Sequence, residues 1–119
     1  MDKLKELRIF AESEEISDLI WRHVRSWDIF SKDTIGKQLV KSVDSIGANI
    51  AEGYGRHSYQ EQVHFLYISR GSLFETAVWV EKAARRNLRM DKDIIKRLEN
   101  FLPQLNAYVT AIKSRKESK

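Results

Sequence analysis

Apolar residues recur along most of the chain at steps of three and four, which is the spacing of one face of an α-helix. Short polar or glycine-containing segments interrupt this pattern three times. The pattern therefore predicts four helices, at about residues 12–26, 32–52, 59–87 and 92–114. Because each connection is short, consecutive helices should lie antiparallel. The predicted fold class is all-α, an antiparallel up-down-up-down four-helix bundle formed by a single domain of residues 1–119.

Capping residues indicate where two of these helices should begin. Ser13 precedes the first apolar row and is a candidate N-cap, because a serine hydroxyl can accept a hydrogen bond from a free N–H of the first turn. Ser31 or Asp33 can do the same for the second helix. Residues 1–11 mix charged and apolar side chains without a clear period, so the pattern assigns them to no element.

Two features set expectations for the fourth predicted helix. Pro103 lies inside it, where proline removes one N–H and crowds the preceding turn. The apolar period continues through this position, so we expect a kink or a frayed turn rather than two separate helices. Residues 113–119 contain no apolar anchor, and we expect this tail to be frayed or disordered.

The segment between the second and third predicted helices should reverse the chain. Gly53 and Gly55 can take the left-handed conformation that ends a helix. Ser58 and Glu61 have the spacing of a capping box, in which each side chain binds a backbone N–H of the next helix. We assign seven residues to this structural turn: Asn49, Glu52, Gly53, Gly55, Arg56, Ser58 and Glu61. A second interpretation is that Asn49 and Glu52 bind a ligand.

The third predicted helix carries apolar residues on three faces. One row has the spacing of a heptad seam: Tyr59, Val63, Leu66, Arg70, Leu73, Ala77, Val80 and Ala84. A second row contains Phe65, Ile68, Ser72, Thr76 and Trp79, and a third contains Tyr67, Phe74 and Val78. One apolar face is enough in a monomeric bundle, so the surplus favours a protein interface and a homo-oligomer. The alternative is that this is simply the central helix.

Composition narrows the class of protein. At 119 residues and 14.0 kDa, the chain is long enough for one core but not for two. It has no cysteine, which excludes disulfides and thiolate zinc sites and fits a reducing compartment. The first twenty residues are rich in charge, so we expect no signal peptide, and no apolar run approaches the length of a membrane span. We therefore expect a cytoplasmic protein with no membrane partner.

The net charge of +4 is unevenly distributed. Residues 1–81 hold 10 basic and 13 acidic side chains, whereas residues 82–119 hold 11 and 4. Seven cations surround the end of the third helix and the start of the fourth: Lys82, Arg85, Arg86, Arg89, Lys92, Lys96 and Arg97. The simpler interpretation is that cations in a last helical turn offset the helix dipole and aid solubility. It does not explain Lys92 and Lys96 at a helix start, so the seven form a candidate nucleic-acid-binding site with weak sequence preference.

The sequence lacks the motifs that bring catalytic residues together. The chain has no cysteine, no Gly-x-Ser-x-Gly elbow and no glycine loop that follows a strand to bind phosphate. Glu61 and His64 form one Glu-x-x-His pair, with His57 close by, but a di-iron bundle needs a second such pair and the sequence has none. The sequence therefore predicts no metal, no cofactor and no enzymatic activity.

Two blocks of the sequence carry a family resemblance. The first reads Ser-Ile-x-x-Asn-Ile-Ala-Glu-Gly-x-Gly-Arg over residues 45–56, and the second contains Phe65-Leu66, Ile68 and Gly71-Ser72-Leu73-Phe74-Glu75. In order and spacing they resemble the 23S ribosomal RNA intervening-sequence proteins, four-helix bundles whose relatives include the accessory variability determinants of diversity-generating retroelements. The resemblance is dense over residues 35–84 and weak elsewhere.

This resemblance has implications for assembly and partners. Members of the family form homopentameric barrels, and the retroelement relatives use a basic exterior to associate with nucleic acid and with a reverse transcriptase. This chain has Val40 where the family usually has a basic residue paired with the one matching Lys41. We therefore place the nucleic-acid hypothesis on the residues after Glu81 and not on the second helix.

Two functions from different classes remain open. The first is a non-catalytic, ring-forming homo-oligomer, expected to be a pentamer, that associates with RNA or DNA as an accessory factor and has a reverse transcriptase or another protein as a further partner. The second is a self-assembling scaffold that binds another protein and no nucleic acid. Phosphate binding should weaken steeply with ionic strength, whereas burial of apolar surface should not.

Overall fold

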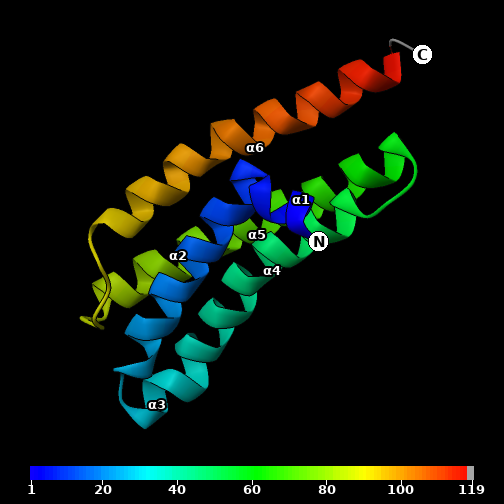
Figure 1. The fold of residues 1–119 in the computed structure, drawn as a ribbon. Coiled ribbons are helices and arrows are strands. Elements are labelled where there is room, and N and C mark those ends of the chain that lie inside the picture. The colour runs from blue at the N-terminus through cyan, green and yellow to red at the C-terminus, as the bar shows by residue number, and fades with distance from the viewer. Residues whose placement is uncertain (118–119) are drawn as a thin grey trace.

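The computed structural model describes residues 1–117, and every element in that part of the chain is helical (Figure 1). The elements are α1 (Asp2–Glu6), α2 (Arg8–Arg25), α3 (Ile29–Ser31), the π-helical η1 (Lys32–Gly36), α4 (Lys37–Tyr54), α5 (Tyr59–Arg85) and α6 (Asp93–Glu117). Because α3, η1 and α4 follow one another without a gap, the chain makes four long helices joined by short connections. This confirms the predicted all-α four-helix bundle. None of the described helices is long and apolar enough to cross a membrane.

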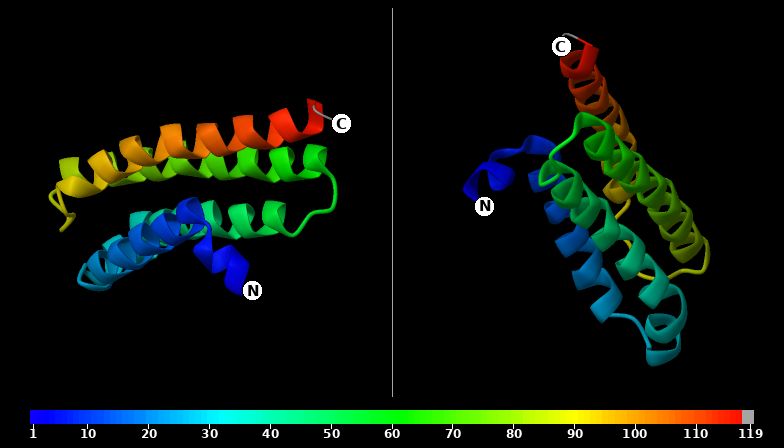
Figure 2. Two further views of the ribbon diagram at one scale, coloured as in Figure 1. Left: turned by 45° about the horizontal axis from the view of Figure 1, so that its top comes forward. Right: turned by 90° about the vertical axis from the view of Figure 1, so that its right-hand side faces the viewer.

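The four long helices form two layers. α2 and α4 pack on each other in one layer, α5 and α6 in the other, and α4 contacts α5 between the layers (Figure 2). Consecutive long helices run in opposite directions (Figure 1). The largest apolar side chains that are fully buried are Ile16, Ile20, Leu39, Ile50, Leu66, Ile94, Phe101, Leu105 and Ile112. They recur at helical spacing, so the apolar period of the sequence identified the core faces correctly.

The first long helix begins earlier than the apolar pattern predicts. α2 starts at Arg8 after Leu7, which makes no side-chain capping bond. Ser13 is buried inside the helix, where its hydroxyl donates to the carbonyl of Phe10 at 2.7 Å, so the predicted Ser13 cap is wrong. The helix extends because Ile9 is buried and Leu7 and Phe10 pack against the core. Tertiary packing of this kind stabilises a helical turn that the local pattern does not reveal.

The second long helix also begins before its predicted start. Its N-cap is Asp28, whose carboxylate accepts a hydrogen bond from Ser31 N at 3.1 Å. The hydrogen bonds from Ser31 hold the pKa of Asp28 below its ordinary value. Asp28 has the extended backbone of an N-cap (φ −66°, ψ 160°), whereas Ser31 is already helical (φ −67°, ψ −38°). The predicted caps, Ser31 and Asp33, are therefore wrong.

The α4–α5 connection does not use left-handed glycines. α4 continues through Gly53 to Tyr54, Gly55 has a φ of −80°, and no glycine of the described chain has a positive φ, so that prediction is wrong. Gly53 is needed for space instead. A Cβ there would lie 3.0 Å from the carbonyl oxygen of Gln62 and 3.2 Å from Cβ of Phe65. Glycine thus allows the first turns of α5 to approach α4 closely.

Among the described residues, Asn87 alone has a positive φ, of 61°. Leu88 N donates to the carbonyl of Ala83 at 3.0 Å, and Asn87 N donates to that of Ala84 at 3.2 Å. This is the Schellman arrangement, in which a left-handed residue closes a helix. α5 consequently ends at Arg85, slightly before its predicted end.

α6 runs without a break through Pro103 to Glu117 (Figure 1). Pro103 is exposed, and Figure 1 shows no sharp bend in the helix, so the expected kink or frayed turn is absent. The tail predicted to fray is helical as far as Glu117, and the Lys113 ammonium lies 5.2 Å from the ring centroid of Tyr67, so that prediction is wrong for these residues. The last two residues of the tail lie outside the described part of the chain.

Candidate nucleic-acid interface

The predicted cations lie around the α5–α6 connection, at one end of the bundle (Figure 1). Only Lys82 and Arg85 belong to α5, because the helix ends there, and Arg86 and Arg89 lie in the connection. Six of the seven have no carboxylate within 4.0 Å among the described residues, and we name them the α5–α6 patch: Lys82, Arg85, Arg86, Arg89, Lys92 and Lys96. Lys82 is half-buried, with its ammonium 5.0 Å from the ring centroid of Trp79, and the other five are exposed.

Arg97 is not a member of the patch, because its guanidinium forms ion pairs with two carboxylates of α2. Its guanidinium lies 3.0 Å from the Glu12 carboxylate and 3.5 Å from that of Glu15, both on α2. Burial lowers the pKa of Arg97, but hydrogen bonds and charge from Glu12 outweigh this and raise the pKa above its ordinary value. Arg97 thus ties α6 to α2, and its charge is already neutralised.

Two carboxylates lie within the α5–α6 patch. The Asp91 side chain accepts a hydrogen bond from Asp93 N at 3.0 Å, at the point where α6 begins. Negative charge at a helix start is favourable, so these carboxylates offset the unfavourable position of Lys92 and Lys96. The α6 side of the patch therefore contains two acids, Asp91 as a side-chain cap and Asp93 in the first turn, and the four cations from Lys82 to Arg89 precede them.

The patch is held against the end of α2 by a buried tryptophan. Trp27 Nε1 donates to the carbonyl of Arg89 at 2.8 Å, and the Trp27 side chain is buried. His23 lies one turn before Trp27, and its Nε2 is buried without a hydrogen-bond partner in the described chain. Burial lowers the pKa of His23, the positive charges of Arg89 and Arg22 lower it further, and Asp91 opposes this shift. The backbone beneath the patch is consequently fixed, which the sequence did not indicate.

The residues assigned to the structural turn divide into two groups. At the start of α5, Ser58 Oγ accepts a hydrogen bond from Glu61 N at 3.1 Å, which confirms the N-cap predicted from the capping-box spacing. Glu52 forms an ion pair with Arg56 one turn later, at the end of α4. Gln62 Nε2 donates to the Arg56 carbonyl at 3.0 Å and completes the connection.

Asn49 acts within α4 rather than at the turn. Its amide donates to the carbonyl and the hydroxyl of Ser45 at 2.8 and 2.9 Å. Ser45 in turn accepts a hydrogen bond from Ser72 Oγ at 3.0 Å, and Thr76 Oγ1 donates to Ser42 Oγ at 3.0 Å. The two hydroxyl contacts link α4 to α5. Asn49 bonds to one member of this network from within α4 and not to the turn to which the sequence assigned it.

Part of the apolar surface of α5 stays uncovered in the single chain. The predicted third row is exposed, with fractions of 37% for Tyr67, 58% for Phe74 and 50% for Val78. Ile29 and Phe30, in α3, are 77% and 75% exposed. The sequence indicated the first group through its extra helical row, whereas the second lies in a segment that it treated as a connection.

The histidines near the turn do not gather with carboxylates. His57 and His64 are both exposed. In the part of the chain that the structure describes, no group of three or more His, Asp or Glu side chains is close enough to hold a metal ion.

Comparison with known proteins places the chain in a family. The sequence profile of the 23S rRNA-intervening sequence proteins matches residues 5–111. The chain belongs to this family. A similar solved structure is that of a protein of unknown function from the S23 ribosomal protein family of Bacteroides thetaiotaomicron, with a TM-score of 0.67 and 23% sequence identity over 87% of this chain and 96% of that one. None of the curated proteins compared matches the sequence.

The matched range covers α2, α4 and α5 in full and α6 as far as residue 111, and it includes the α5–α6 patch. The block over residues 45–56 that carries the resemblance has a packing role here. Asn49 joins the hydroxyl network between α4 and α5, and Gly53 allows their close approach. The structural likeness to the Bacteroides protein concerns the fold alone.

Proposed function

We propose that this protein is a non-catalytic homo-oligomer of the cytoplasm that forms a ring and associates with RNA or DNA through the α5–α6 patch, as an accessory factor. The observation that carries the proposal is the set of six cations without ion-pair partners in the described chain, on a connection fixed by the bond between Trp27 and Arg89. Cations that are not neutralised within the protein can replace the counterions of nucleic-acid phosphates.

The chemistry of the patch favours phosphate contacts over base recognition. Its members are lysines and arginines. The ring of the neighbouring Trp79 already makes a cation–π contact with the Lys82 ammonium. Without an aromatic side chain free for stacking, contacts to phosphate should give binding with little sequence preference. The name of the family refers to an insertion in 23S rRNA, which makes RNA the first nucleic acid to test.

Self-association would multiply the patch. Tyr67, Phe74 and Val78 offer exposed apolar surface on α5, and apolar surface of this kind favours a protein interface. A ring would then carry one patch per subunit, which increases the affinity for a long polyanion. A reverse transcriptase or another protein is the further partner that we propose for such an assembly.

Binding of a single-stranded RNA, measured over a range of salt concentrations, tests this function. Replacing Arg85, Arg86 and Arg89 together by Gln keeps helix propensity and removes three charges per subunit. Affinity should fall, and the slope of log affinity against log salt should become shallower by up to about one unit for each phosphate that the variant no longer binds.

The matched control removes three cations elsewhere. Lys3, Lys5 and Arg8 are exposed, and the short α1 that carries the lysines contains no buried residue, so their replacement by Gln leaves the core intact. This control should bind RNA nearly as the wild type does. An equal loss of affinity in the control would mean that only net charge matters, and unchanged binding in the Arg85, Arg86 and Arg89 variant would reject the patch.

The second candidate function is a scaffold that binds another protein and no nucleic acid. Ile29 and Phe30 favour it, because two large apolar side chains at 77% and 75% exposure have no contact in the single chain that covers them. RNA binding that is absent at low salt would move this function to first place.

A further inference from the structure

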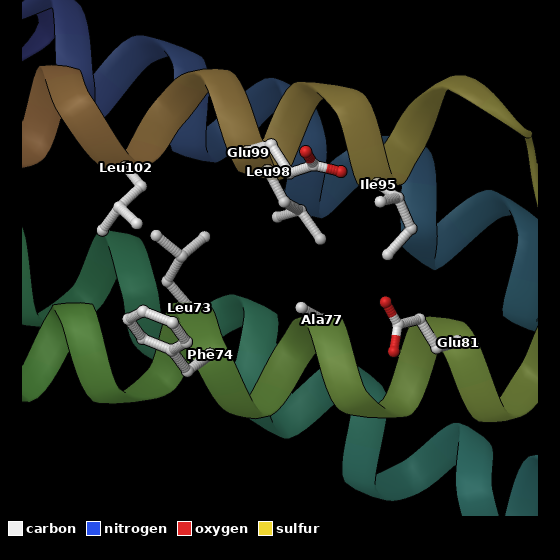
Figure 3. A pocket seen from close by; sticks show the side chains of 8 residues that line it. All are labelled: Leu73, Phe74, Ala77, Glu81, Ile95, Leu98, Glu99 and Leu102. Atoms are coloured by element: carbon white, nitrogen blue, oxygen red, sulfur yellow. The ribbon is translucent and has the colours of Figure 1, made fainter.

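Two apolar grooves open on opposite layers of the bundle. The first, named the α5–α6 groove, has a volume of about 170 Å³ and lies on the outer side of that layer, with α2 and α4 behind it (Figure 3). Its floor is apolar, and a carboxylate stands on each side, Glu81 on α5 and Glu99 on α6. Phe74, 58% exposed, lines one end.

The second groove, named the α2–α4 groove, has a volume of about 360 Å³. It is lined by Trp21, Val24, Arg25, Lys32, Gly36, Lys37, Val40 and Lys41. Four of these residues are cations and none is acidic, while Trp21 is 52% exposed beside them. Because α2 and α4 form one layer and α5 and α6 the other, the two grooves lie on different layers of the bundle.

The two surfaces are complementary in chemistry. Each has an apolar centre, and the rims carry opposite charges: Glu81 and Glu99 on one, and the lysine and arginine side chains on the other. None of Glu81, Glu99, Lys37 and Lys41 has an ion-pair partner among the described residues. Complementary charge around apolar contact is the arrangement that fixes partner and register in protein interfaces.

We propose that the occupant of each groove is a second copy of this chain, with the α2–α4 face of one subunit packed on the α5–α6 face of the next. Trp21 is the apolar anchor that lies over the α5–α6 groove, and Lys37 and Lys41 lie opposite Glu81 and Glu99. A two-fold contact of either face with itself would place like charges together and leave the other groove uncovered. The head-to-tail contact covers both, and such contacts build rings or filaments. This inference rests on the proposed homo-oligomer and specifies the faces that form it.

Two charge-reversal variants test the pairing. The first variant combines Glu81→Lys with Glu99→Lys, and the second combines Lys37→Glu with Lys41→Glu. Each variant places like charges across the contact. Each alone should therefore lose the wild-type assembly and show the 14.0 kDa mass of one subunit by light scattering. An equimolar mixture should assemble again, because every contact between the two variants pairs opposite charges. Only alternating complexes of the two can form, and a closed ring of five cannot alternate, so the mixture should give the mass of an even number of subunits, at least two, and not that of the wild-type assembly. Trp21→Ser, which changes no charge, should also reduce the mass.

Controls separate this inference from the proposed function. Two control variants make the same charge changes on α1: Lys3→Glu with Lys5→Glu matches the lysine reversals, and Asp2→Lys with Glu6→Lys matches the glutamate reversals. Both should leave the mass of the assembly unchanged. Circular dichroism and thermal melting establish that each variant is folded. If the wild type assembles and either groove variant keeps its mass, or if folded variants do not reassemble when mixed, the assignment of faces is wrong while the homo-oligomer stands. A wild type that is monomeric at micromolar concentration overturns both.

Discussion

Gly53 illustrates how the role of one residue depends on its neighbours. The sequence suggested a left-handed turn residue, but Gly53 lies inside α4 with ordinary helical angles and faces the backbone of α5. The short distance to the Gln62 carbonyl explains why glycine is required there. This reason could not be predicted, because it depends on a contact between two helices and not on the local pattern.

Gly53→Ala should destabilise the protein by about 1 kcal/mol. Alanine gains up to about 1 kcal/mol of helix propensity, but the added Cβ crowds a backbone oxygen, and such overpacking costs about 1–3 kcal/mol. Gly71→Ala is the matched control, since nothing lies within 4 Å of its added Cβ. That variant should gain about 0.5–1 kcal/mol, as expected for an exposed helical position. Urea unfolding measures both, and equal gains would show that α5 does not approach Gly53 closely.

His23 should make stability depend on pH. Its folded-state pKa lies below the ordinary value of 6.5, so the unfolded chain takes up a proton more readily than the folded one. The stabilising effect is complete above the unfolded pKa and is lost as pH falls toward the folded pKa. In His23→Gln, the fall in unfolding free energy from about pH 8 to about pH 5 should be smaller than in the wild type. A wild-type slope in His23→Gln would contradict this account.

At the scale of elements, the helices were predictable and their ends were not. Long apolar rows identified all four helices, because each row spans several turns of a buried face. The ends depend on single contacts instead. Ile9 extends α2 through the core, Asp28 rather than Ser31 caps the second helix, and Asn87 closes α5. A sequence offers several candidate caps, and packing selects among them.

The closure of α5 predicts opposite effects at Asn87. Asn87→Ala should lose about 1 kcal/mol of stability, because a left-handed conformation is costly for a residue with an ordinary Cβ. Asn87→Gly should be at least as stable as the wild type, since glycine is preferred at this position. Asn100→Ala on the exposed side of α6 is the control and should gain about 0.5 kcal/mol through helix propensity. Thermal unfolding distinguishes these outcomes, and a stable Asn87→Ala would mean that α5 ends in another way.

At the scale of the whole molecule, the sequence predicted where the cations lie but not which of them are in ion pairs. Their positions in the sequence placed them near the α5–α6 connection, which the fold confirms. The ion pairs of Arg97 with Glu12 and Glu15 join α6 to residues far away in the sequence. No local pattern could therefore show that Arg97 differs from the other six predicted binding residues. The two grooves likewise exist only once helices are placed side by side.

The exposed apolar row of α5 predicts the state of the protein in solution. Tyr67, Phe74 and Val78 form an exposed apolar row, which favours a protein interface. We therefore expect light scattering to give a mass near that of five 14.0 kDa subunits, the number implied by the family resemblance. Replacing Phe74 and Val78 together by Lys should reduce the mass without unfolding the bundle, because both side chains lie outside the core. Lys substitutions at Ala11 and Gln104, which are exposed on other helices, add the same charge and should leave the mass unchanged. A wild-type mass of 14.0 kDa at micromolar concentration would show that the row has another role, such as contact with a different protein.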